Sequence, residues 1–207
     1  LRDGEIVVTH RLVDASNATL LGTIEGLGKV IYKPVAGERP LWDFPEGTLA
    51  YREYATYLLS DFLQLNLVPM TLLREGPFGF GMVQQWIEID ESVDLLAFGE
   101  SQNSQLRMMA LFDAMINNTD RKFGHILIDH QGRLYGCDHG VTFHHEFKLR
   151  TVLWQFAGDI FTDTEESLLA DIEAKSDQIT ALFDQYLSEV EIAAFFERVA
   201  VLRRDQA

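Results

Sequence analysis

The feature that most constrains the fold of this 207-residue chain is a change in its pattern of apolar residues near residue 86. Before this point, short segments alternate between apolar and polar residues, which is typical of strands with one buried face. From about Asp90 onward, apolar residues recur at the three- and four-residue spacing of helices. The sequence therefore predicts a strand-rich first part and a mainly helical second part, joined by a hinge within 84–90.

The first part is expected to form an antiparallel sheet, because short turn-forming segments separate its strands. The expected strands cover 6–13, 19–24, 30–33, 70–74 and 80–86. One helix is expected over 49–65, where apolar residues follow a single stripe. Three prolines between residues 34 and 45 make regular structure improbable in that segment.

In the second part, a helix is expected to end at Ile116, just before the run Asn-Asn-Thr-Asp. A hairpin is expected around Gly132, because apolar triplets flank it on both sides. The remaining segment is expected to be helical, with a helix over 163–186 capped by Asp163 and Glu166 and a helix over 188–202 capped by Ser188 and Glu191.

The formal charge of −15 disfavours nucleic acid and anionic membranes as partners, because both carry negative charge. A small anion such as ATP is still allowed, because local cations and backbone N–H groups decide its binding. Cys137 is the only cysteine, so the chain has no internal disulfide, as is usual in a reducing compartment. We therefore expect a cytoplasmic monomer with neither a nucleic-acid partner nor a stable membrane association.

Two carboxylates draw attention to the middle of the chain. Asp120 follows a predicted helix and Asp138 follows the predicted hairpin, which returns the chain to its starting point. Both side chains are thus able to face one site, with His125 between them in the sequence. Such a group holds a divalent ion or shares acid–base work. The alternative is that both aspartates only cap loops and that the histidine is exposed.

Two residues of the first part favour the chemical interpretation. Lys33 ends an apolar strand, and Glu53 lies on the following helix, where its carboxylate is able to pair with a buried lysine. Phosphoryl transfer needs this order of groups: a lysine on phosphates, a glutamate that orients it, an aspartate at the acceptor hydroxyl and an aspartate on the metal. The alternative is an edge-strand lysine and a solvated glutamate.

These segments resemble a known superfamily. Asn-Asn-Thr-Asp-Arg at 117–121, Gly-His-Ile-Leu at 124–127 and Cys-Asp-His-Gly at 137–140 look like the catalytic and metal-binding loops of phosphatidylinositol 3- and 4-kinase-like proteins, to which HipA-type kinases are more distantly related. The segments 37–45, 81–84 and 148–154 are similar to a bacterial family of that superfamily that is common in actinobacteria. The resemblance implies an α+β, bilobal protein-kinase-like fold, with an antiparallel N-lobe over 1–86 and a helical, catalytic C-lobe over 87–207.

The resemblance also implies roles for individual residues. Asp120 matches the catalytic aspartate, Asp138 the metal-binding aspartate, Lys33 the phosphate lysine and Glu53 its helix partner. His125 stands where the second metal ligand is normally Asn. The other implied contacts with the nucleotide are Ser16 and Asn17 in place of a glycine-rich loop, and Gln84, Gln85, Trp86 and Ile87 at the hinge beside the adenine.

His125 affects the expected metal. Mg²⁺ prefers oxygen ligands, whereas an imidazole also suits Mn²⁺ or Zn²⁺. The expected cofactors are therefore ATP with Mg²⁺ or Mn²⁺, with a preference for Mn²⁺. The stretch of chain between Asp138 and the next predicted helix is too short for a long activation segment. This argues against a regulated protein kinase that docks peptides.

The expected function is an ATP-dependent phosphotransferase whose acceptor is a hydroxyl on a protein, including the chain itself, or on a small inositol-like polyol. Two alternatives remain open: a nucleotide-binding pseudokinase, and an enzyme that transfers AMP. The remaining candidates have surface or packing interpretations. Lys122 is able to reach phosphate, Lys148 and Arg150 lie where an acceptor docks or on the surface, His144 and His145 are expected in a surface loop, and Trp42, Trp86 and Trp154 are expected to pack.

Overall fold

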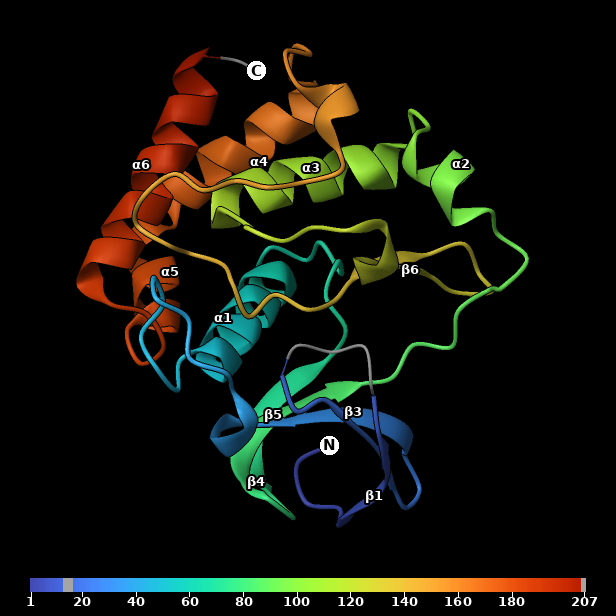
Figure 1. The fold of residues 1–207 in the computed structure, drawn as a ribbon. Helices are drawn as coiled ribbons and strands as arrows, with labels where there is room; N and C mark the ends of the chain where they lie inside the picture. The colour runs from blue at the N-terminus through green and yellow to red at the C-terminus, as the bar shows by residue number, and fades with distance from the viewer. Residues whose placement is uncertain (13–16, 206–207) are drawn as a thin grey trace.

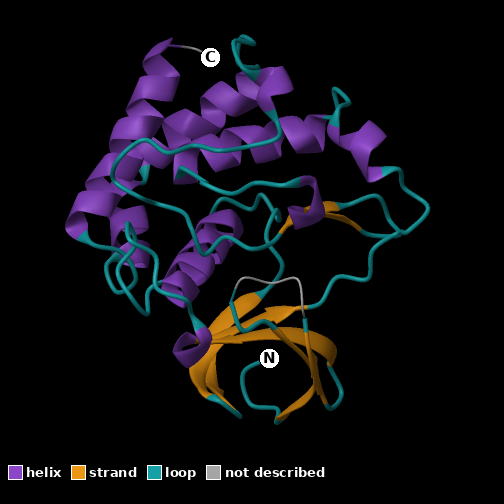
Figure 2. Ribbon diagram, in the orientation of Figure 1, coloured by secondary structure: helices purple, strands orange, loops and turns teal. Residues whose placement is uncertain are grey.

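The computed structural model of the chain describes residues 1–12 and 17–205. A sheet built from the first part of the chain lies at one end of the molecule, and a set of helices built from the second part lies at the other (Figure 1). One helix of the first part, α1 (Leu49–Phe62), lies between the sheet and the other helices. Figure 2 shows the same separation of strands from helices. The predicted α+β division into a strand-rich and a helical part is confirmed.

The sheet contains five antiparallel strands in the order β1-β2-β3-β5-β4. Their bounds are β1 (Ile6–Arg11), β2 (Leu20–Ile24), β3 (Gly28–Pro34), β4 (Thr71–Gly76) and β5 (Gly79–Gln85). All five correspond to predicted strands. β3 lies at the centre, and Lys33 on it pairs with Met82 of β5. Because β3 is a central strand, the backbone of Lys33 is held in a fixed position. Lys33 lies near the end of β3 that faces the helices.

Helix α1 ends three residues earlier than predicted. The predicted stripe extended to residue 65, but Gln64 and Asn66 both have left-handed backbone angles, with φ of 56° and 54°. A left-handed residue interrupts an α-helix, so the apolar residue between them packs without being helical. The start of α1 is held by the carboxylate of Glu38, which accepts hydrogen bonds from the backbone N–H groups of Leu49 and Ala50.

The helical part contains five helices and a short hairpin among the described residues. The helices are α2 (Leu95–Gly99), α3 (Ser104–Ile116), α4 (Asp163–Ala174), α5 (Ser176–Phe183) and α6 (Glu189–Asp205), and the hairpin strands are β6 (Ile126–Ile128) and β7 (Leu134–Gly136). Three short 3₁₀ turns complete the chain at Val35–Gly37, Phe123–His125 and Trp154–Phe156. Helix α2 was not predicted, because five residues are too few to show a helical period.

The predicted helix over 163–186 is wrong in two details. It is divided into α4 and α5 at Lys175, whose backbone leaves the helical region. Its capping pair lies one residue earlier than predicted, because the Thr162 side chain accepts from the backbone of Glu165 and the Glu165 carboxylate accepts from Thr162. The capping pair of Ser188 and Glu191 at the start of α6 is confirmed, with N–O and O–O distances of 2.9 and 2.8 Å.

The apolar core is divided in the same way as the chain. The larger cluster joins α1, α3, α4, α5 and α6 through fully buried side chains such as Leu59, Phe112 and Phe195. A smaller cluster lies within the sheet around Val30 and Tyr32. The cores are separate, so the surfaces between them are free to carry polar groups. None of the helices in the described part of the chain combines the length and apolar character that a membrane-spanning helix requires.

Candidate active site

A cleft of about 890 Å³ lies between the sheet and the helical part. Its walls include four of the residues singled out from the sequence, Lys33, Glu53, Asp120 and Asp138. These come from β3, α1, the loop after α3 and the loop after β7, so the fold brings together groups that are 105 residues apart in the chain. The cleft is therefore the place to test the predicted chemistry.

Lys33 lies between two carboxylates. Its Nζ donates to Oε1 of Glu53 in a short contact and to Oδ1 of Asp138 at 2.7 Å. Glu53 is almost fully buried, while the Asp138 side chain is 47% exposed on the cleft side. The second oxygen of Glu53 accepts the backbone N–H of His139 at 3.2 Å. Glu53 thus fixes both Lys33 and the loop that carries Asp138, and Asp138 keeps an accessible oxygen.

The charges of this triad follow from its surroundings. Burial alone would lower the pKa of Lys33, but the carboxylates of Glu53 and Asp138 outweigh it and raise that pKa. The positive charge of Lys33 lowers the pKa of Asp138 and outweighs the opposing effect of the partial removal of this carboxylate from water. Burial raises the pKa of Glu53, and Lys33 opposes that effect. At neutral pH, the site therefore holds an ammonium group next to an ionised Asp138 carboxylate.

Asp120 is positioned by polar residues around it. Asn117 ends α3 in a left-handed conformation with φ of 52°, which turns the chain sharply into the loop. The side-chain oxygen of Asn118 accepts the backbone N–H of Asp120 at 3.0 Å, and Thr119 donates twice to the carbonyl of Val141. Among the described residues, the carboxylate of Asp120 bonds one side chain, the exposed amine of Lys122, at 2.7 Å. The backbone is thus fixed while the carboxylate stays accessible.

A buried ion pair supports this loop from behind. Arg121 donates to both oxygens of Asp113 on α3 at 2.8 Å, and neither side chain is exposed. The same guanidinium contacts the His139 ring at 2.7 Å and the carbonyls of His125 and Cys137 at 3.2 and 3.3 Å. One side chain therefore joins α3, the loop of Asp120 and the loop of Asp138. Its ionic partner is Asp113, and the backbone carbonyls of His125 and Cys137 complete its contacts with the two loops.

Asp138 and His125 are the groups suited to a divalent ion. Nε2 of His125 lies 3.4 Å from Oδ2 of Asp138, and burial lowers the pKa of His125, so its ring is neutral and able to donate a lone pair. Nδ1 of the same ring is buried without a hydrogen-bond partner. No cluster of three or more His, Cys, Asp or Glu ligands occurs among residues 1–12 and 17–205. These two residues therefore fit a divalent ion whose remaining ligands come from phosphate and water.

The hinge residues lie at the end of β5. The side chain of Gln84 is buried and donates to Thr71, so it does not face the cleft. The backbone N–H groups of Gln85 and Trp86 bond the carbonyls of Met70 and Lys29. Within the described residues, the backbone of Ile87 has no hydrogen-bond partner. None of the four hinge residues lines the cleft; Gln85, Trp86 and Ile87 line a different hollow, next to the hairpin of β6 and β7.

The predicted phosphate loop is described only in part. Ser16 lies outside the described residues. Asn17 lines the cleft, and its side-chain oxygen accepts the backbone N–H of Arg39 at 2.9 Å. The Asn17 side chain therefore holds the segment that carries Arg39.

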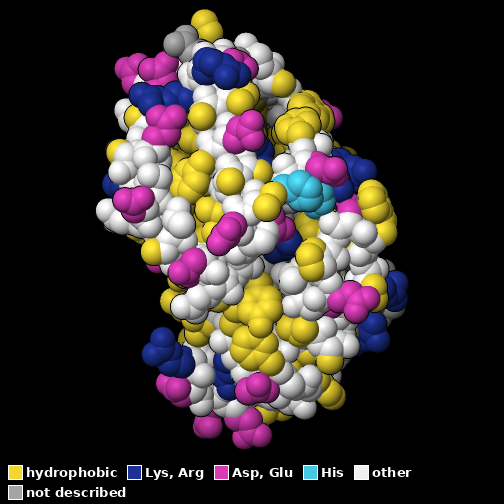
Figure 3. All heavy atoms as spheres, turned by 90° about the vertical axis from the view of Figure 1, so that its left-hand side faces the viewer, with side chains coloured by type: hydrophobic (Ala, Val, Ile, Leu, Met, Phe, Trp, Pro, Cys, Tyr) yellow, Lys and Arg dark blue, Asp and Glu magenta, His cyan; other side chains and the backbone are white. Residues whose placement is uncertain are grey.

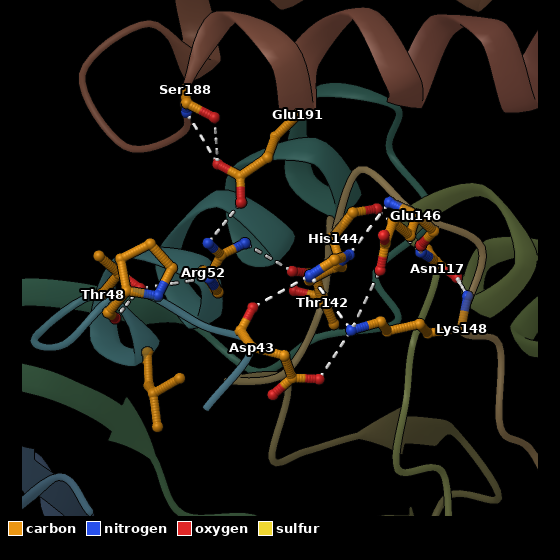
Figure 4. A network of polar contacts seen from close by, with 12 residues as sticks. Asp43, Thr48, Arg52, Asn117, Thr142, His144, Glu146, Lys148, Ser188 and Glu191 are labelled. Carbon is orange, nitrogen blue, oxygen red and sulfur yellow. Dashed lines mark hydrogen bonds and ion pairs between the residues drawn. The ribbon is translucent and has the colours of Figure 1, made fainter. Parts of the chain in front are cut away.

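The side of the cleft next to Asp120 differs most from the expectation. Figure 4 shows Lys148 pointing toward Asp43, and their ion pair of 2.8 Å joins the segment before α1 to the segment after β7. Lys148 also lies 4.8 Å from the ring of Trp42. Trp42 and Trp154 are 93% and 55% exposed and both line the cleft, so the expectation that they pack is wrong.

His144 also differs from the expectation of a surface loop. It is buried, and its Nε2 bonds the carbonyl of Asp43 at 3.0 Å, whereas its neighbour His145 is exposed. The carbonyl of His144 accepts from Asn117 (Figure 4). His144 is therefore a structural link between the cleft wall and the loop of Asp120.

Sequence reasoning missed how the segment after β7 attaches to the loop of Asp120. The backbone N–H of Arg150 bonds the carbonyl of Asn118 at 2.9 Å, and the backbone N–H of Arg121 bonds the carbonyl of Arg150 at 3.0 Å. Lys148 donates its N–H to the side chain of Asn117. This pairing places Lys148 and Arg150 beside Asp120. Residues with no regular structure give no periodic signal, so the pairing was not visible in the sequence.

No protein-family model matches the chain. Solved structures are similar to it over 99% of its length. The Golgi casein kinase superposes with a TM-score of 0.65 at 13% identity over 72% of that chain, and its form with Mn/ADP bound with a TM-score of 0.66 at 14% identity over 73%. The proinflammatory kinase CtkA of Helicobacter pylori superposes with a TM-score of 0.56 at 12% identity over 93%. The chain thus has the protein-kinase-like fold of these atypical kinases.

A closer relative is found by sequence. Protein Rv2133c of Mycobacterium tuberculosis is 43% identical over 201 residues, a match that spans 79% of this chain and 72% of that protein. The match is long enough to include both the sheet and the helical part. The chain therefore belongs to the family of protein Rv2133c.

Proposed function

We propose that the protein is an ATP-dependent phosphotransferase that moves the γ-phosphate of ATP to a hydroxyl group. The observation that carries this proposal is the Lys33 ammonium held between Glu53 and Asp138 in a cleft that Asp120 also lines. Phosphoryl transfer depends on positioning and on charge, and these groups supply both. The likeness to solved kinases supports the proposal through the fold.

Each residue has a distinct role in the proposed reaction. Lys33 binds phosphate oxygens, and Glu53 keeps its amine directed into the cleft. Asp120 orients the acceptor hydroxyl and takes its proton. The acceptor oxygen forms a bond to the γ-phosphorus while the bond from that phosphorus to the bridging oxygen of ADP breaks. Arg121 holds the backbone of both aspartate loops and does not touch the reacting atoms.

A divalent ion bound by Asp138 and His125 would neutralise phosphate charge. Support for a metal also comes from the similar Golgi casein kinase with Mn/ADP bound. Because His125 offers nitrogen where oxygen is usual, we expect Mn²⁺ to be preferred to Mg²⁺. Transfer measured with each ion, for the natural chain and for His125→Asn, tests this. Full activity with Mg²⁺ and an unchanged metal profile in the variant would contradict it.

The nucleotide is expected to lie between an N-lobe over 1–86 and a C-lobe over 87–207. The free backbone of Ile87 is the proposed contact for the adenine edge, and Asn17 and Lys33 lie toward the phosphates. Gln84, Gln85 and Trp86 support the hinge through their own hydrogen bonds. The relation to phosphatidylinositol kinase-like and HipA-type proteins remains part of the proposal.

The acceptor is a protein hydroxyl or a small polyol. Arg39 and Arg150 line the cleft and are exposed, and neither has a carboxylate within ion-pair distance among the described residues. In a chain with 32 acidic and 17 basic residues, cations without partners mark a surface suited to an anionic ligand. They are available to nucleotide phosphates or to a negatively charged acceptor. A cytoplasmic monomer remains our expectation.

Mass spectrometry of the protein and of a metabolite pool incubated with ATP tests the proposal. We expect a gain of one phosphate on the chain or on a metabolite, with loss of this product in Lys33→Met and Asp120→Asn. Lys175→Met and Asp171→Asn are matched controls, because those residues form an exposed pair on α4 and its end, and they should keep full activity. A gain of AMP would instead show nucleotidyl transfer.

A nucleotide-binding protein without transfer activity is the second candidate. The observation that favours it is the metal site, for which the described residues supply only Asp138 and His125. Nucleotide binding that stabilises the protein against heat, without any labelled product, would support this candidate. Absence of both binding and transfer with either Mg²⁺ or Mn²⁺ would refute both.

A further inference from the structure

A second cavity lies on the helical part, beside the active-site cleft. It is a groove of about 530 Å³ between α3, α6 and the segment 145–161. The helices contribute small side chains to its lining, Ala110 and Ala114 of α3 and Ala194 of α6, which leave space between the helices and are called its floor below. Its volume lies in the range of pockets that bind drug-sized molecules. The hollow is therefore large enough for a ligand and is formed by the choice of alanine at the positions that face it.

The rim of the groove exposes large apolar side chains. Phe147 and Trp154 are 74% and 55% exposed, and both line the groove as well as the neighbouring cleft. Val201 of α6 adds to the same surface. Exposed apolar patches around a hollow are typical of binding sites, because leaving them in water is unfavourable. Figure 3 shows hydrophobic side chains gathered in several places on the face of the molecule that carries α5 and α6.

Arg198 of α6 lines the groove and forms no ion pair within residues 1–12 and 17–205, although the nearby charges of Glu197 and Glu191 act on it. Its Nε donates to the carbonyl of Met115 at 3.0 Å and its Nη1 to the carbonyl of His144 at 3.2 Å. Its Nη2 is shielded from water and has no hydrogen-bond partner among the described residues. A guanidinium has five N–H donors, so three remain unused. Burial lowers the pKa of Arg198 to about 10, which still leaves it charged at neutral pH.

The other charged residues of the groove limit the kind of anion. Arg107 is paired with Asp159 and Glu165, so it has no spare charge. Glu197 also lines the groove and is exposed. The carboxylates repel every anion, and the repulsion grows with the number of negative charges on the ligand, so a ligand with one negative charge is favoured over one with several. The groove thus combines one available cation with an apolar floor and rim.

We propose that this groove binds a small amphipathic molecule with one negative charge, an alkyl or aryl carboxylate. Its carboxylate pairs with Arg198, and its apolar body lies on the alanine floor against Phe147 and Trp154. This site is separate from the proposed transfer of phosphate, and its test does not use that activity. Because Trp154 belongs to both hollows, its fluorescence is expected to report binding.

The test compares three ten-carbon probes, decanoate, 1-decanol and decyltrimethylammonium, titrated below their micelle concentrations. Binding is followed by calorimetry and by tryptophan fluorescence. We expect decanoate to bind at least about tenfold more tightly than decanol, because a hydrogen bond to a charged group contributes that much. We expect decyltrimethylammonium to bind least well. Equal binding of the three probes would overturn the proposal.

Three variants locate the site. Arg198→Gln should weaken decanoate about tenfold or more and leave decanol unchanged. Ala114→Phe fills the floor and should weaken both probes, and it keeps the test valid if Arg198→Gln fails to fold. Arg203→Gln, on the exposed face of the same helix, is the matched control and should change neither. The proposal fails if Arg203→Gln has the effect of Arg198→Gln, or if Ala114→Phe binds decanoate normally.

Sedimentation velocity excludes the other occupant, a second copy of the chain. A dimer that decanoate does not dissociate, but that Ala114→Phe does, would show that the groove is an interface between copies and would overturn the proposal. A monomer that binds decanoate supports it.

Discussion

Replacing Arg121 by Met should strongly destabilise the protein. Arg121 and Asp113 are both fully buried and share two hydrogen bonds of 2.8 Å. Without the guanidinium, the Asp113 carboxylate keeps only the side-chain N–H of Asn118 as a partner, at 2.9 Å. Removing one member of a buried ion pair costs about 3–5 kcal/mol, because the remaining charge is left without a counter-charge. For a chain of this length, that loss lowers Tm by about 6–20 °C.

The double variant separates this cost from the net value of the pair. Asp113→Leu should be as harmful as Arg121→Met, because it leaves a buried guanidinium unpaired. The variant with both changes removes both charges, so its loss should be clearly smaller than the sum of the two single losses, with a coupling free energy of about 2 kcal/mol or more. Denaturant unfolding followed by circular dichroism gives these free energies of unfolding.

The matched control is Lys175→Met, which removes one member of an exposed ion pair with Asp171. Exposed pairs contribute about 0–1 kcal/mol, so this variant should unfold almost as the natural chain does. A loss below about 1 kcal/mol for Arg121→Met, or losses that simply add in the double variant, would refute the view that this ion pair supports both aspartate loops.

Two further predictions concern packing and pH. A Cβ at Gly81 would lie 2.4 Å from the carbonyl oxygen of Lys33, so Gly81→Ala should lower the free energy of unfolding, measured in denaturant, by about 1–3 kcal/mol. The control is Gly124→Ala, whose added Cβ meets nothing within 4 Å, and it should change this free energy little. Burial alone would raise the pKa of Glu191, but the charge of Arg52, 2.5 Å away, outweighs burial and lowers that pKa. The stabilising contribution of Glu191 is therefore complete above its unfolded pKa of about 4.3, and it is lost as the pH falls through the lower pKa of the folded state. Glu191→Gln should therefore be less stable than the natural chain at pH 7, and this difference should narrow below about pH 4 in thermal unfolding; a constant difference would contradict the assigned pairing.

Local patterns were sufficient for most of the fold. All five strands of the sheet were predicted, the first from alternation and the others from short apolar runs between turn-forming residues, and the capping pair of Ser188 and Glu191 follows from its spacing. The errors occur where the apolar pattern continues past a residue whose backbone angles leave the helical region. The apolar stripe of α1 extends beyond Gln64, and the stripe of α4 runs through Lys175 into α5. Side-chain periodicity reports burial, whereas the end of a helix depends on backbone angles that the pattern does not encode.

The candidate site was predictable in its residues but not in its connections. Chemical logic was enough to place Lys33, Glu53 and Asp138 together, because a buried lysine requires a counter-charge. It was not enough to find Asp113, which lies on α3 and is linked to the site through the buried side chains of Arg121 and Asn118. Trp42 looked like a core residue because tryptophan is usually buried. Its exposure follows from the cleft, which no sequence pattern describes.

The motif around Asp120 therefore divides into one chemical residue and several supporting ones. Asn117 holds the segment 144–148, Asn118 holds Asp113 and the backbone of Asp120, and Arg121 holds Asp113. In the part of the chain that the structure describes, the carboxylate of Asp120 pairs with one side chain, that of the exposed Lys122. If the proposed function is correct, Asp120→Asn should abolish transfer while leaving Tm nearly unchanged, because exposed pairs contribute little. Loss of activity that is always accompanied by loss of stability would mean that Asp120 is one more supporting residue and not the proton acceptor.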